Sequence, residues 1–120
     1  MSKIVVIESD LAMRTLISEW LAAAGHVVEA WATVKGGHRC DAAVVVVGIS
    51  NVRSHAEQAV AEVRAWCAHS TIIGMSAQLA RSLAPDSAIV RALGLSRLIA
   101  KPCTRDELLA AVGRAIGANH

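Results

Sequence analysis

The sequence predicts an α/β protein in which helices cover both faces of one parallel sheet. Short apolar runs alternate from end to end with stretches whose apolar residues recur at helical spacing. Five such strand-then-helix units fit into the 120 residues, and strict alternation of this kind is typical of a doubly wound sandwich with a central five-stranded parallel sheet. The length suits one domain, which we expect over residues 1–120 with its core at about 3–117.

The composition restricts the core and the partners. Apolar residues make up 54% of the chain while Phe and Tyr are absent, so the core must be aliphatic apart from three tryptophans. A net charge of +2 without a cluster of Lys or Arg offers no electrostatic footprint for nucleic acid or an anionic membrane. The longest apolar run, residues 42–47, is too short to span a bilayer, and the first ten residues lack a signal-peptide core. We therefore expect a cytoplasmic protein.

The first half of the chain gives clear element signals. Lys3–Ile7 is a short apolar run and predicts a strand. A helix follows, with Asp10 as its N-cap and Gly25 as its end. Its apolar face consists of Met13, Leu16, Ile17, Trp20, Leu21 and Ala24. Residues 26–30 predict a second strand, and residues 31–39 contain two adjacent glycines and predict at most a short, weak helix.

The second half begins with four consecutive valines, Val44–Val47, which indicate a strand buried on both faces. The remaining elements follow in order: a helix opened by the capping-box pattern at 54–57, a strand at 71–75, a helix at 86–93, a strand at 97–100 and a final helix opened by a second capping box at 104–107.

The cysteines do not form a recognisable motif. Cys40, Cys67 and Cys103 are odd in number, and no pair has C-x-x-C spacing. Together with the expected location this predicts reduced, mostly buried thiols. Cys67 and His69 lack the two further ligands of a zinc site, so we expect neither a metal nor a cofactor.

In a parallel sheet, the side chains that follow the strands meet at one edge, where α/β proteins bind ligands. Here the first strand is followed by Glu8 and Ser9, the fourth ends at Ser76, and the fifth is followed by Lys101 and Pro102. The valine strand delivers no acid, because Asp and Glu are absent from residues 42–56.

In this order and at these intervals, the segments "IVVIESD", "TIIGMSA", "ALGLSRLIAKP" and "TRDELLAAV" resemble the receiver domain of two-component response regulators over roughly residues 3–117. The resemblance implies a CheY-like, flavodoxin-like fold and a role in bacterial phosphorelay signalling. Receivers accept a phosphoryl group on an aspartate at the end of the third strand. An acidic pair after the first strand holds Mg²⁺ there, and a hydroxyl and a lysine bind the phosphate.

Carried over by residue, the resemblance places Glu8 at the first acid and Ser9 where the second acid belongs. Ser76 corresponds to the hydroxyl and Lys101 to the lysine. Leu98 stands at the switch position, which is usually aromatic. The acceptor position falls on one of three residues that carry no carboxylate: Val46, Val47 and Gly48. The resemblance thus implies a degenerate phosphorylation site, in which we expect Glu8 and Lys101 to form a partly buried ion pair.

Two functions remain open at this point. The first is a pseudo-receiver that is not an enzyme and binds a protein partner, a histidine kinase or another regulator. It would bind this partner, or form a homodimer, through the face made by the fourth helix, the fifth strand and the fifth helix. The residues of that face are Ala88, Ile89, Ala92, Leu95, Leu98 and Ala111. The second is a small flavodoxin-fold ligand-binding protein or enzyme that uses the same sheet edge.

Two further expectations concern the extent of the protein and the places of two tryptophans. Met1 and the short tail after Gly117 favour a free-standing protein over one piece of a hybrid kinase or regulator. Trp31 and Trp66 fit either peripheral core positions or interface anchors.

Overall fold

The computed structural model describes residues 2–34, 40–49, 56–77, 82, 87–101 and 103–118. Its centre is a five-stranded sheet in the order β2-β1-β3-β4-β5, in which every neighbouring pair is parallel. The strands are β1 (Lys3–Ile7), β2 (Val27–Trp31), β3 (Val44–Gly48), β4 (Thr71–Ser76) and β5 (Arg97–Ala100). The predicted fold class is therefore confirmed.

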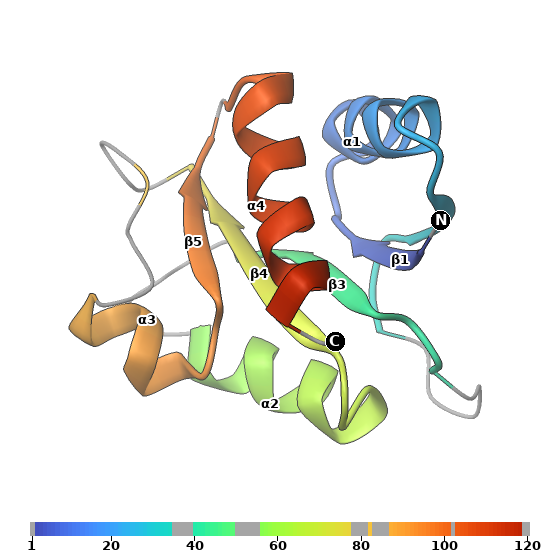
Figure 1. The fold of residues 1–120 in the computed structure, drawn as a ribbon. Coiled ribbons are helices and arrows are strands. Elements are labelled where there is room, and N and C mark those ends of the chain that lie inside the picture. Colours follow the sequence, from blue (N-terminus) through green and yellow to red (C-terminus); the bar gives the residue numbers. More distant parts are fainter. Residues whose placement is uncertain are drawn as a thin grey trace.

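Helices cover both faces of the sheet (Figure 1). Those on one face are α1 (Leu11–Ala23) and α4 (Arg105–Ala118), and those on the other are α2 (Ala56–Trp66) and α3 (Ala88–Leu93). Each face has its own aliphatic core, as the absence of Phe and Tyr requires.

The valine strand connects the two cores. Val44 and Val46 pack in the cluster under α1 and α4, whereas Val45 and Val47 pack in the cluster under α2 and α3. None of the four is more than 3% exposed. Because successive side chains of a strand point to opposite faces, a strand in the middle of a two-sided sheet must be apolar at every position.

Three predicted helix ends are confirmed. The Asp10 carboxylate accepts the Met13 backbone N–H at 3.1 Å, which satisfies one of the free donors at the start of α1. Thr104 Oγ1 accepts the Glu107 N–H at 3.0 Å at the start of α4. Gly94 ends α3 with a left-handed φ of 73°.

Element boundaries differ from the predictions by one or two residues. Strand β2 lies at 27–31 rather than 26–30, and β4 includes Ser76 as its last residue. The described part of α3 begins at Ala88, and the predicted start at Asp86 lies outside the described residues. The same holds for the predicted cap at Ser54 and for most of the weak helix at 31–39. Among the described residues, no helix has both the length and the apolar character needed to cross a bilayer.

The prediction of three reduced cysteines is wrong for two of them. Cys40 and Cys67 form a disulfide, with their Cα atoms 5.2 Å apart. The fold brings them together because β3 and β4 begin at the same edge of the sheet, where the Thr71 N–H donates to the Ala43 carbonyl at 3.1 Å. Cys40 lies four residues before the first residue of β3, and Cys67 directly follows α2. Cys103 is a free, half-buried thiol.

The two unassigned tryptophans contact each other. The rings of Trp31 and Trp66 lie 5.1 Å apart between their centroids, and Trp66 packs against the core under α2. Both side chains are partly buried, which favours the peripheral-core interpretation.

Candidate functional site

A buried ion pair lies at the carboxyl edge of the sheet. Glu8, the first residue after β1, is 5% exposed, and its Oε1 pairs with the Lys101 ammonium, which follows β5. The second carboxylate oxygen, Oε2, accepts the Asp10 backbone N–H at 3.2 Å. The expected pairing of Glu8 with Lys101 is therefore present, across the two strands β3 and β4 that separate β1 from β5.

The Glu8 carboxylate fills the space above Gly48, the last residue of β3. A Cβ atom built on Gly48 would lie 2.7 Å from Glu8 Oε1 and 2.9 Å from both Cδ and Oε2. The register explains this closeness, since Ile7 pairs with Val47 and the next residues along the two strands are Glu8 and Gly48. Glycine suits this position because a Cβ would overlap the carboxylate and force the Glu8 side chain to move.

Gly48→Ala is expected to lower the free energy of unfolding by about 1–3 kcal/mol, the usual cost of overpacking a filled site. The new methyl group must displace the Glu8 carboxylate, which Lys101 and the Asp10 N–H hold in place. Urea denaturation monitored by circular dichroism measures the change.

Gly113→Ala is the matched control for this substitution. Gly113 is an exposed residue of α4, and a Cβ there would meet nothing within 4 Å. Alanine should stabilise the helix by about 0.5–1 kcal/mol. If both alanine variants raised the stability, the packing of Glu8 over Gly48 would be contradicted.

The other candidate acceptor positions lie inside the cores. Val46 points into the cluster under α1 and α4, and Val47 into the cluster under α2 and α3. Ser76 and Leu98 are 0% exposed. The backbone carbonyl of Ser76 accepts the backbone N–H of Lys101 at 2.9 Å, which places Ser76 beside the residue that forms the ion pair. Ser9 is exposed.

The residues of this edge do not fit a Mg²⁺ site. A hard divalent cation needs several oxygen ligands, with carboxylates foremost. The Glu8 carboxylate is engaged by Lys101, and neither Ser9 nor Gly48 brings a carboxylate. Asp10 caps α1. Within the described ranges, no three His, Cys, Asp or Glu side chains gather as metal ligands.

Asp41, the acid nearest in sequence to the valine strand, lies at the opposite edge of the sheet. Its carboxylate pairs with the Lys3 ammonium at 2.7 Å, at the start of β1. The hydrogen bond that the Lys3 ammonium donates to Asp41 raises the pKa of Lys3 above its usual value. Asp41 therefore does not supply the missing carboxylate beside Lys101.

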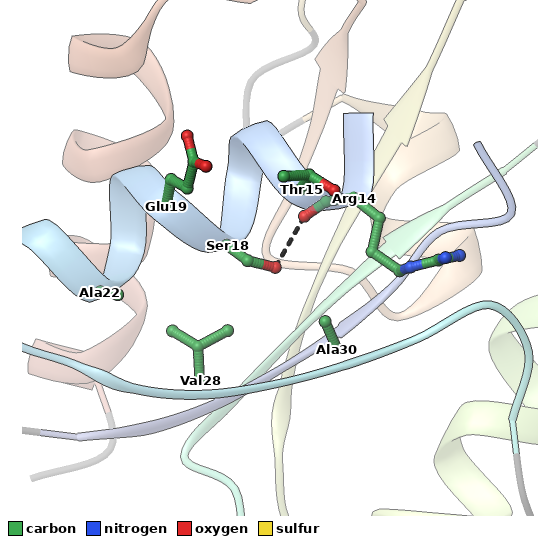
Figure 2. Close-up of a pocket in the computed structure, with 7 residues that line it drawn as sticks. All are labelled: Arg14, Thr15, Ser18, Glu19, Ala22, Val28 and Ala30. Carbon is green, nitrogen blue, oxygen red and sulfur yellow. Dashed lines mark hydrogen bonds between the residues drawn. The ribbon is translucent and has the colours of Figure 1, made fainter. Parts of the chain in front are cut away.

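Arg14 also supports this site, a role that the sequence does not predict. Its Nη1 donates to the Glu8 backbone carbonyl at 2.8 Å and so fixes the turn that carries the ion pair. Figure 2 shows Arg14 at one end of a hollow between α1 and β2, with Ala22 and Val28 at the other end. This hollow has a volume of 430 Å³. The position of Arg14 on α1 gives no signal in the sequence for its contact with Glu8.

A second hollow of 250 Å³ lies at the carboxyl edge itself. It is next to Gly48 but on the α2 side of the sheet, with Ile7, Val47 and Val63 as apolar walls and Ser9 and Glu62 among its polar residues. A small molecule with an apolar body could enter it.

The predicted interaction face divides into core and surface. Leu95, Leu98 and Ala111 are buried and belong to the cores. The exposed members are on α3: Ala88, Ile89 and Ala92, of which Ile89 is 46% exposed.

Several solved structures that this chain resembles are response regulators or their receiver domains. A CheY-like response regulator receiver domain protein from Methanospirillum hungatei has a TM-score of 0.77 at 14% identity, over 99% of this chain and 96% of that chain. The chemotaxis response regulator CheY4 of Vibrio cholerae has a TM-score of 0.75 at 19% identity, over 96% of this chain and 98% of that chain. An orphan response regulator of H. pylori has a TM-score of 0.72 at 15% identity, over 96% of both chains.

No protein-family model matches the sequence, and no curated protein matches it either. At sequence identities this low, the likeness shows a shared backbone fold. The fold of this chain is that of CheY-like response regulator receiver domains.

Proposed function

We propose that this chain is an atypical receiver that is not phosphorylated on aspartate and that signals by binding another protein. The observation that carries the proposal is the Glu8 carboxylate, paired with Lys101 and packed over Gly48. In the receiver fold the end of β3 is the place of the phosphoacceptor. Of the three candidate positions, Gly48 fits that place best, because Val46 and Val47 are core residues.

The proposal follows from what phosphoryl transfer to a carboxylate needs. The acceptor must be accessible to the phosphodonor, and cations must neutralise the phosphate oxygens. Here the Glu8 carboxylate is buried and already engaged by the lysine that would otherwise meet the phosphate. Ser76 and Leu98, at the hydroxyl and switch positions, are packed in the interior. With no phosphoryl group to bind, nothing at this site favours a second conformation.

Acetyl phosphate with Mg²⁺ tests this proposal directly. The chain is incubated with both and its intact mass is measured, beside a receiver that has an acceptor aspartate as the positive control. We expect an unchanged mass for this chain and a phosphoryl adduct for the control. A stable phosphoryl adduct on Glu8 or any other acid would overturn the proposal.

The partner in this proposal is a histidine kinase or another regulator in the cytoplasm of a bacterium. The exposed Ile89 and its small neighbours on α3 support an interaction surface, or a homodimer face, made by α3, β5 and α4. The dimer is checked by sedimentation of the chain and of its Ile89→Asp variant, which should be monomeric at every concentration.

The 250 Å³ hollow beside Gly48 favours a second candidate function, a small-ligand-binding protein of the same fold. A thermal-shift screen with nucleotides, flavins and divalent metals separates the two. A large shift with one compound supports ligand binding, and a flat screen contradicts it.

A further inference from the structure

The disulfide between Cys40 and Cys67 spans the unit that carries the vacant acceptor position. The covalent loop that it closes contains all of β3, with Gly48 at its end, and all of α2. Helix α2 in turn provides Glu62 and Val63 to the hollow beside Gly48. The state of this bond therefore bears on how firmly α2 is held against the carboxyl edge.

The two sulfurs differ in their access to solvent. Cys67 is 1% exposed and belongs to the core under α2, whereas Cys40 is only partly buried. Its Sγ lies 3.8 Å from Ser70 Oγ, a hydroxyl that donates to the Ala42 carbonyl at 2.6 Å. An external thiol can therefore approach Cys40 but not Cys67.

We propose that Cys40 and Cys67 are a reversible redox-modification site, whose substrates are dithiols and disulfides and whose state sets how firmly α2 is seated on the sheet. This step rests on the intracellular signalling role proposed above, since disulfides of intracellular proteins are usually redox-active rather than permanent.

The exchange balances with a dithiol as reductant. One thiolate of the dithiol attacks Cys40 Sγ and forms a mixed disulfide, while Cys67 leaves as a thiolate and takes up a proton. The second thiol of the reductant then displaces Cys40, so that two electrons pass to the protein and the reductant leaves as a disulfide. With reduced glutathione, a second molecule takes the place of the second thiol, and oxidation by oxidised glutathione reverses these two steps and releases two molecules of reduced glutathione.

Without the bond, α2 is held by noncovalent contacts alone. Its inner face packs through Ala56, Val60 and Val63. Arg64 adds a second tie near the C-terminal end, where its guanidinium donates to the carbonyls of Ser70 at 2.7 Å and Gly94 at 3.2 Å. These contacts keep the helix folded in the reduced protein, but they leave the segment around Cys40 without its covalent anchor.

Cys103 is the internal control. Burial, followed by the charge of Glu107, raises the pKa of the Cys103 thiol, so it stays protonated and reacts slowly in exchange. It lies after β5, two residues beyond Lys101 and far along the chain from the pair.

The test is a redox titration of the full chain in buffers of reduced and oxidised glutathione. Free thiols are trapped by alkylation and counted by intact mass and peptide mapping. We expect the labels on Cys40 and Cys67 to be lost together as the oxidised fraction rises, while Cys103 keeps its label. Three labels at every ratio would overturn the proposal, as would a pair that includes Cys103. So would a bond that remains intact in the folded chain at the most reducing ratio.

Hydrogen exchange of the two end states tests the consequence for α2. Peptides from 56–66 should lose more protection in the reduced chain and in Cys67→Ser than peptides from α1 and α4, whose loss follows only the lower global stability. Cys103→Ser should titrate and exchange like the wild type. Equal protection of α2 in both states would overturn its redox-dependent seating. Because neither measurement involves phosphorylation or a partner, the result is independent of the acetyl phosphate experiment.

Discussion

Replacing Lys101 with methionine is expected to lower the free energy of unfolding by about 3 kcal/mol, because it leaves the buried Glu8 carboxylate without its cation. The Asp10 N–H, 3.2 Å from Oε2, would still donate to that carboxylate but carries no full positive charge. Methionine keeps much of the apolar stem of lysine, so the loss reports the charge rather than a cavity. Urea denaturation at neutral pH gives the change.

Two variants make this result specific. Lys3→Met removes a lysine from the same sheet whose partners, Glu29 and Asp41, are exposed, and its effect should be much smaller. Combining Lys101→Met with Glu8→Leu removes both charges from the site and should restore most of the stability, since an apolar pair can replace a buried ion pair. A Lys101→Met loss no larger than that of Lys3→Met would show that the ion pair is not a structural element.

The order of strands and helices could be predicted because local chemistry and burial agree along most of the chain. The four valines of β3 are apolar at every position because both of their faces are covered. The Asp10 cap and the Gly94 stop are local hydrogen-bond and backbone effects that a sequence displays directly. Boundaries were less accurate, since β2 begins at Val27 only because its partner Lys3 begins β1.

The site could be predicted in part. Glu8 and Lys101 were identified by their place after two strands, and their pairing followed from charge. The choice among Val46, Val47 and Gly48 depends on strand register and on which face each side chain occupies, which the residue types alone do not contain. The contact between Arg14 and the Glu8 carbonyl depends on the direction in which α1 leaves the turn.

The disulfide could not be predicted because its cysteines are 27 residues apart and share no motif. The two cysteines meet because β3 and β4 are parallel neighbours and α2 runs back between them, which places Cys67 near the start of β3, beside Cys40. The expected compartment predicts reduced thiols, but it indicates only what is common there and not which cysteines this fold brings together.

Reduction of the Cys40–Cys67 bond is expected to lower the free energy of unfolding by about 3.5 kcal/mol, from the loop entropy that a separation of 27 residues restores to the unfolded chain. The native contacts of α2, including those of Arg64, are present in both states, so the loss arises chiefly in the unfolded ensemble. Denaturation of the oxidised and the reduced protein measures it. Cys40→Ser should match the reduced protein, and Cys103→Ser should stay close to the oxidised wild type. Equal stability of the two redox states would contradict a closed loop around β3 and α2.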